Sequence, residues 1–165
     1  MEGKKSKSRA LLIFGAPCSG KTTFAAKFAD RYDLAFYNIN EVMEQYDFSR
    51  ETMLEVLKLI AKTRKNLIIE GGLDTEEERR ELKNLFYGAG YEPSLFWVQT
   101  DINTIRKRMK FQYKSVAKAR EVYDTVVSGM EAPTETEDPI ILSGKHTFET
   151  QTKHALAGLA DVNSR

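Results

Sequence analysis

One eight-residue segment, GAPCSGKT at positions 15–22, restricts the fold of this chain more than any other part of the sequence. It fits the pattern G-x-x-x-x-G-K-[ST] at every defined position. From average composition, such a string arises by chance in about one in two hundred chains of this length. It also follows an apolar run, Leu11 to Phe14, and precedes a helical pattern, which is the context that a phosphate-binding loop requires. A glycine-rich turn without a ligand is the structural alternative.

Each residue type in this loop has a physical role in binding a nucleotide. Glycines let the backbone curve around a β-phosphate, and backbone N–H groups and the helix N-terminus point at the anion. We expect Lys21 to reach the β- and γ-phosphate oxygens and the Thr22 hydroxyl to bind Mg²⁺. The predicted ATP-binding residues are Gly15, Ala16, Pro17, Cys18, Ser19, Gly20, Lys21, Thr22 and Thr23.

Short apolar runs alternate with helical patterns along the chain. The runs lie at 11–14, 35–39, 67–69, 95–98 and 140–142, and the clearest helical patterns lie at 21–32, 49–64 and 75–90. The third helix has a capping-box pattern at its start, formed by Thr75 and Glu78. Strands that alternate with helices of this length predict an α/β fold, in which a five-stranded parallel sheet has helices on both faces.

The length of 165 residues fits one domain, which we expect at 10–165 after a basic N-terminal tail at 1–9. With 25 basic and 24 acidic side chains the net charge is +1, so a nucleic-acid partner is possible but is not supported by net charge. The lone cysteine excludes an internal disulfide and fits a reducing compartment. No apolar stretch has the length of a signal peptide or membrane span, so we expect a cytoplasmic protein without a membrane partner.

Ligands bind beyond the carboxyl ends of the strands in open parallel sheets, and this rule selects the acidic candidates. Glu70 directly follows the third run, where a carboxylate can hold a metal ion through its water shell, or can simply hydrogen-bond the loop. Glu41 and Glu44 follow the second run, three residues apart, and one of them is the candidate general base. The alternative is that both are exposed acids at a helix start. Asp101, after the fourth run, is expected to cap a helix.

Charge is segregated after the fourth run. Seven basic residues and no acid lie within 102–120, and six acids and no base lie within 121–138. In small kinases of this topology a mobile lid at this place supplies arginines to the transferring phosphoryl group. We therefore expect a short basic lid at about 111–117, with Arg108 and Arg120 as catalytic candidates; two solvated helix faces are the alternative.

The order of these segments resembles the small P-loop kinases of the AAA_33 and zeta-toxin-like group, including the phage polynucleotide 5′-hydroxyl kinase domain. The resemblance covers nearly the whole chain and rests on GAPCSGKT at 15–22, FYNIN at 36–40, LIIE at 67–70, EERR at 77–80, the segment 96–108 and MEAP at 130–133. It implies a nucleoside-kinase-like fold and the use of ATP. The family has a catalytic aspartate and an arginine where this sequence has Val42 and Gln45, and its third-strand aspartate is Glu70 here. What the resemblance implies therefore does not extend to the acceptor.

The sequence thus predicts a Mg·ATP-dependent kinase that transfers the γ-phosphoryl group to a hydroxyl of a small molecule, a nucleotide or a polynucleotide 5′ end. Lys21 and the loop amides would hold the phosphates, Thr22 and Glu70 the metal, and the lid arginines the transition state. A nucleotide-binding switch or scaffold without transfer activity is the alternative, favoured by Val42 and Gln45. A third reading is an NTP hydrolase, for which Glu70 is the one clear candidate to position water.

Overall fold

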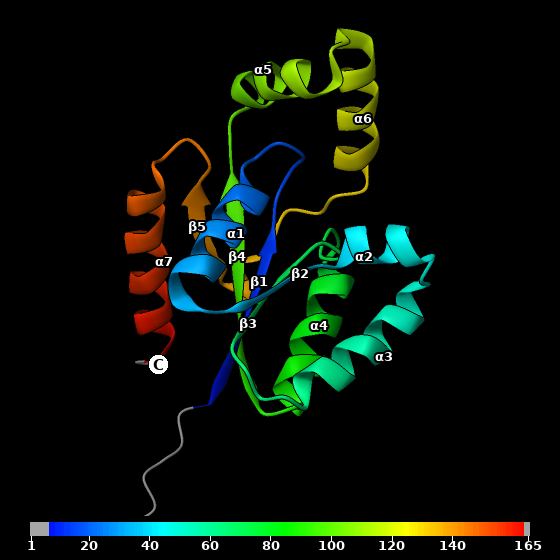
Figure 1. Ribbon diagram of the computed structural model, residues 1–165. Coiled ribbons are helices and arrows are strands. Elements are labelled where there is room, and N and C mark those ends of the chain that lie inside the picture. The colour runs from blue at the N-terminus through cyan, green and yellow to red at the C-terminus, as the bar shows by residue number, and fades with distance from the viewer. Residues whose placement is uncertain (1–6, 164–165) are drawn as a thin grey trace, which may run out of the picture.

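The computed structural model describes residues 7–163 and has an α/β fold built on a five-stranded sheet (Figure 1). The strand order is β2-β3-β1-β4-β5, and every neighbouring pair is parallel. The predicted fold class is confirmed. The elements are β1 (Ser8–Phe14), α1 (Lys21–Tyr32), β2 (Ala35–Asn38), α2 (Ile39–Tyr46), α3 (Arg50–Ala61), β3 (Leu67–Glu70), α4 (Glu76–Gly88), β4 (Tyr91–Gln99), α5 (Ile102–Tyr113), α6 (Val116–Ser128), the short 3-10 helix η1 (Glu135–Glu137), β5 (Ile140–Ser143) and α7 (Phe148–Asn163).

Helices cover both faces of the sheet and bury it in two apolar clusters. Successive side chains of a strand point to opposite faces, so the continuous apolar run of β1 supplies side chains to both clusters. Leu12 and Phe14 pack with α3 and α4 on one face, and Leu11 and Ile13 pack with α1 and α7 on the other. This double burial explains why β1 and β3 are apolar at successive positions instead of alternating.

Helices α5 and α6 lie beyond the carboxyl ends of the strands, as the yellow-green and yellow helices of Figure 1 show. A small separate cluster of Ile105, Met109 and Ala119 joins them. The expected lid at 111–117 is the corner between these helices: Lys114 adopts a left-handed conformation with φ of 52°, and the Ser115 side chain accepts a hydrogen bond from the Lys118 N–H. The segment is thus largely helical.

The predicted end of the N-terminal tail is wrong by two residues. Ser8 and Arg9 belong to β1, where they pair with Tyr91 and Glu92 of β4. The Arg9 N–H also donates a 2.8 Å hydrogen bond to Asn66 Oδ1. Backbone pairing extends the strand past the apolar run, which hydrophobicity alone does not show. The rest of the expected tail, residues 1–6, lies outside the described residues.

Two further boundaries differ from the expectation for physical reasons. Strand β2 ends at Asn38, whose side chain accepts from the Glu41 N–H, so Ile39 is the first residue of α2 and not the last of the strand. Strand β4 begins at Tyr91 and contains Pro93, a residue that sheets tolerate where no neighbour needs its missing N–H. Strand β5 pairs with β4 only from Phe96 onward, so β4 is an edge strand at Pro93.

The predicted capping box at the start of α4 is confirmed. The Thr75 hydroxyl accepts from the Glu78 N–H at 3.2 Å, and Glu78 Oε2 accepts from the Thr75 N–H at 3.2 Å. Among the helices within residues 7–163, none combines the length and the apolar character that crossing a lipid bilayer demands.

Candidate functional site

The loop predicted to bind phosphates connects β1 to α1 at the carboxyl edge of the sheet. It passes close to β4: a Cβ on Gly15 would lie 2.4 Å from the Val98 carbonyl oxygen, so only glycine fits there. Gly20 takes the cap position of α1 with φ of 101° and provides no side-chain cap. The first N–H groups of this 12-residue helix are therefore open to an anion held in the loop.

Lys21, Thr22 and Glu70 meet at the rim of this loop, as the sequence predicted for a phosphate and metal site. Lys21 Nζ donates to the Ala16 carbonyl oxygen at 3.2 Å, inside the curve of the loop. The Thr22 hydroxyl donates to Glu70 Oε1 at 2.6 Å. The sheet register pairs Glu70 with Ile13, so the carboxylate emerges next to the strand that leads into the loop.

The Glu70 carboxylate is buried, with 3% of the residue exposed. Burial raises the pKa of Glu70, and the nearby charge of Glu41 raises it further, while the Thr22 hydrogen bond and the charge of Lys21 lower it; the net change is upward. Its Oε2 atom has no hydrogen-bond partner among the described residues. A buried carboxylate oxygen without a partner, next to a threonine hydroxyl, fits the oxygen ligands that Mg²⁺ prefers. Thr22 and Glu70 are therefore the residues that would hold the ion.

A pocket of about 770 Å³ adjoins the loop, between α1, α5 and the connection from β5 to α7. Its size is that of a small-ligand site. A larger groove, of about 1190 Å³, lies between α3 and α4 and contains none of the predicted site residues. The pocket by the loop is lined by Pro17, Cys18, Gly20, Lys21, Thr22, Thr23, Phe24, Lys27, Arg108, Gln112, Tyr113, Gly144, His146, Thr147, Phe148 and Gln151.

The structure brings Arg108 to the loop but does not bring Arg120 there. Arg108 Nη1 donates to the carbonyl oxygens of Cys18 and Ser19 at 3.1 and 3.2 Å, and its Nη2 donates to the Gly144 carbonyl oxygen at 2.8 Å. Arg108 thus joins the loop to the β5–α7 connection. The Arg120 side chain is 83% exposed on α6, where it pairs with Asp124 at 3.6 Å. It lines a groove between α5 and α6 instead of the pocket by the loop.

Glu41 and Glu44 are both exposed on α2. Glu41 lies near enough to Glu70 for its charge to raise the pKa of that residue, which places it at the border of the site. Glu44 lies nearly one turn further along the helix. Val42 packs against the apolar cluster under α2, so the helix presents no acid at that position.

Cys18 connects the loop to α5, because its thiol donates to Gln112 Oε1 at 3.1 Å. Burial raises the pKa of the Cys18 thiol, an effect that the charges of Lys21 and Arg108 only partly offset. The thiol therefore stays protonated near neutral pH, which fits a packing role better than a reactive one.

The prediction that Asp101 caps a helix is confirmed. Asp101 Oδ1 accepts from the Thr104 N–H at 3.0 Å, and Asp101 Oδ2 accepts from the Thr104 hydroxyl at 2.8 Å. These bonds and the ion pair with Lys145, at 3.1 Å, lower the pKa of Asp101.

Sequence reasoning missed Asp74 and Arg79, which follow β3. Arg79 is completely buried. It forms two hydrogen bonds with the Glu137 carboxylate, at 2.6 and 3.1 Å, and lies over the Phe14 ring, 4.8 Å from its centre. The signal was available: Arg79, Leu82 and Phe86 are spaced three and four apart and share the buried face of α4.

The loop, the buried acid beside it and the adjoining pocket define a P-loop protein with a kinase-like nucleotide-binding fold. The model of the AAA_33 family, described as an AAA domain, matches residues 11–135, and the chain belongs to this family. No curated protein sequence matches the chain.

Solved structures with this fold include several kinases. A gluconokinase from Sinorhizobium meliloti 1021 is 14% identical, with a TM-score of 0.71 over 96% of this chain and 95% of that chain. The APS kinase CysC of Mycobacterium tuberculosis, in complex with AMPPNP and APS, is 14% identical, with a TM-score of 0.66 over 93% of this chain and 98% of that chain. Kti12 of Chaetomium thermophilum, in complex with ADP-AlF3, is 16% identical, with a TM-score of 0.66 over 92% of this chain and 97% of that chain.

Proposed function

We propose that this protein is an ATP-dependent kinase that transfers the γ-phosphoryl group of Mg·ATP to a hydroxyl of a small molecule, a nucleotide or a polynucleotide 5′ end. The observation that carries the proposal is the contact between Thr22 and Glu70 beside Lys21. A structural turn has no need of a buried carboxylate with a free oxygen. A loop that binds a metal-bound nucleotide does need one.

The residues of the site have separate tasks in such a reaction. Lys21 and the loop N–H groups neutralise and orient the phosphate oxygens. Mg²⁺, when bound, would supply positive charge that offsets the charge of the phosphates, and Thr22 and Glu70 are the residues that would hold it. Arg108 fixes the outer side of the loop through the Cys18 and Ser19 carbonyls, and its charge lies at the pocket. Glu41 and Glu44 of α2 are the general-base candidates that the sequence predicts.

A panel of acceptors tests the proposal. Labelled ATP with Mg²⁺ is offered together with nucleosides, nucleotides, sugars and 5′-hydroxyl oligonucleotides, and transfer of the label to one of them is the expected result. A nucleotide-binding switch is the second candidate, since Val42, which packs against an apolar cluster, stands where the family has its catalytic aspartate. Tight Mg·ATP binding without transfer to any acceptor would favour the switch.

We expect the helical corner at 111–117 to become protected from hydrogen exchange when a nonhydrolysable ATP analogue binds. Arg108, Gln112 and Tyr113 of α5 line the pocket. In the described part of the chain, a small apolar cluster with three buried residues holds α5 to α6. A helix pair with so little buried contact opens readily, and a ligand that bridges α5 to the phosphate loop slows this opening. The α3–α4 groove serves as the internal control, with no expected change. Unchanged exchange at 111–117 would show that this segment is an ordinary helical surface.

A further inference from the structure

The pocket and the phosphate loop together define the side from which an acceptor must approach. The pocket lies toward β4 and β5, bounded by α5 and the β5–α7 connection, so it fits the base and sugar of the nucleotide. Lys21 lies between this pocket and the end of β3, where its charge acts on both Glu70 and Asp74. In-line transfer needs the attacking oxygen opposite the leaving phosphate. The acceptor hydroxyl therefore approaches from the β3 side.

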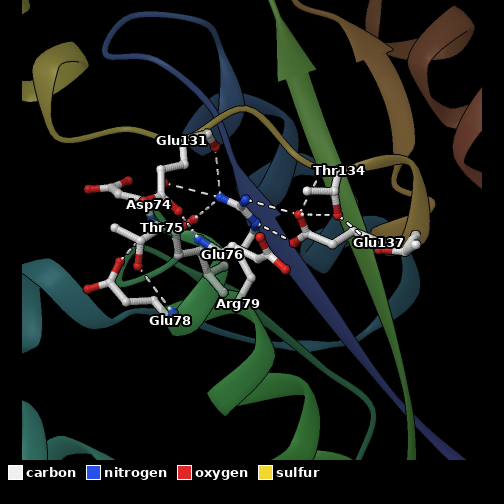
Figure 2. A network of polar contacts seen from close by, with 10 residues as sticks. Asp74, Thr75, Glu76, Glu78, Arg79, Glu131, Thr134 and Glu137 are labelled. Atoms are coloured by element: carbon white, nitrogen blue, oxygen red, sulfur yellow. Dashed lines mark hydrogen bonds and ion pairs between the residues drawn. The ribbon is translucent and has the colours of Figure 1, made fainter.

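The segment that carries Asp74 is held rigidly on that side by buried Arg79. Arg79 Nη1 donates to the carbonyl oxygens of Leu73, Asp74 and Glu131 at 3.1, 3.1 and 3.0 Å. The Glu131 N–H donates to the same Asp74 carbonyl at 2.8 Å. Figure 2 shows Asp74 and Glu131 on one side of the Arg79 guanidinium and Glu137 with Thr134 on the other.

The contacts made to Asp74 itself engage its backbone. The Asp74 N–H donates to Glu78 Oε2 at 2.9 Å. Within residues 7–163, no hydrogen bond or ion pair is made by the Asp74 carboxylate, which is half-buried. An acid whose backbone is held in place and whose carboxylate is partly withdrawn from water, yet free to accept a hydrogen bond, has the properties of a catalytic base.

We propose that Asp74 accepts the proton of the acceptor hydroxyl in the transfer reaction, an inference that rests on the proposed kinase function. The hydroxyl proton passes to an Asp74 carboxylate oxygen while the hydroxyl oxygen forms a bond to the γ-phosphorus. The bond from the γ-phosphorus to the β–γ bridging oxygen breaks, and its electron pair leaves with ADP. Asp74 then returns its proton to solvent. This makes Asp74 the replacement for the acid that α2 lacks at Val42.

The environment of Asp74 agrees with this role. Burial raises the pKa of Asp74, and the charge of Glu78 raises it further, while Lys21 and Arg79 lower it; the net change is upward. An upward change brings the carboxylate closer to the pKa at which a base works well near neutral pH. Glu41 and Glu44, by contrast, are exposed to solvent on α2.

The test compares Asp74→Asn with wild type in single-turnover release of γ-phosphate from Mg·ATP, with water as the probe acceptor. Asparagine keeps the size of the side chain and leaves the backbone contacts to Arg79 and Glu131 in place. A loss of about a hundredfold or more is expected, since a general base contributes about a hundred- to ten-thousandfold. Glu77 is an exposed acid of α4, three residues after Asp74, so Glu77→Gln is the matched control and should keep the wild-type rate.

Binding of Mg·ADP, measured by calorimetric titration of each variant, separates the possible failures. Asp74→Asn should bind Mg·ADP within about twofold of wild type. A rate loss below about tenfold, or an equal loss in Glu77→Gln, overturns the assignment of Asp74, as does a loss found in Glu41→Gln instead. If wild type binds Mg·ADP but transfers phosphate neither to water nor to any acceptor of the panel, transfer and the inference both fail while nucleotide binding stands. If wild type does not bind Mg·ADP, the proposed function itself fails.

Discussion

Replacing Lys21 with alanine is expected to remove most of the rise in Tm that Mg·ATP gives the wild-type protein. A ligand that binds only the folded state at about one hundred times its Kd stabilises it by about 2.7 kcal/mol. For a domain of this size that corresponds to a rise in Tm of about 5 to 10 °C. Lys21 Nζ lies inside the curve of the loop, 3.2 Å from the Ala16 carbonyl oxygen. When a nucleotide binds, a phosphate oxygen would replace this carbonyl as the acceptor of the lysine. Without this charge the loop loses its main electrostatic partner for the β- and γ-phosphates.

Thermal scans of wild type, Lys21→Ala and Lys65→Ala, with and without Mg·ATP, measure the effect. Lys65 is an exposed lysine just before β3, at the opposite edge of the sheet, so its variant should show the full wild-type rise. Equal rises in wild type and Lys21→Ala would show that the loop does not bind phosphates.

Replacing Arg79 with methionine is expected to lower the free energy of unfolding by about 3–5 kcal/mol, the usual effect of removing one partner of a buried ion pair. The Arg79 side chain is completely buried and that of Glu137 is 10% exposed. Methionine can fill part of the space but donates no hydrogen bond, so the Glu137 carboxylate and the Leu73 and Glu131 carbonyls lose the bonds that the guanidinium donates. Arg80→Met, at the exposed neighbouring position, is the control and should change stability by less than about 0.5 kcal/mol.

Urea titrations over a range of pH test the Arg79–Glu137 pair through protonation of the Glu137 carboxylate. Although burial raises the pKa of Glu137, hydrogen bonds from Arg79 and from the Thr134 N–H outweigh it, and the net change lowers this pKa. The ionised carboxylate therefore stabilises the fold above its unfolded pKa of about 4.3, and this contribution is lost as the pH falls through the lower folded value. The difference between wild type and Arg79→Met should shrink in that acid range. A difference that is small at pH 7, or that does not change with pH, would contradict the role assigned to this pair.

Much of the fold followed from local features of the sequence. Five apolar runs and the helices between them predicted the parallel sheet, because each pattern reflects burial of its own segment. The capping box at Thr75 and the cap at Asp101 were equally predictable, since both involve residues only three apart. The boundaries that failed, at Ser8 and at Tyr91, depend on pairing between strands that lie far apart in the chain.

The residues of the candidate site also separate into those that local sequence predicted and those that only the tertiary structure selected. The loop motif alone predicted Lys21 and Thr22, and the strand-end rule added Glu70, because these positions follow from the order of elements. Charge composition selected Arg108 and Arg120 equally, but the turn at Lys114 directs α6 so that only Arg108 reaches the loop.

The sequence by itself determined the individual strands, the phosphate loop and the acid that faces it, since each is encoded within one short segment. Only the tertiary structure decided what holds the Asp74 segment. Glu131 and Glu137 both follow Arg79 by more than fifty residues, and they meet it because α4 and the segment before β5 pack side by side. A buried guanidinium requires several acceptors arranged in space, and a linear sequence does not reveal which distant carbonyls and carboxylates will supply them.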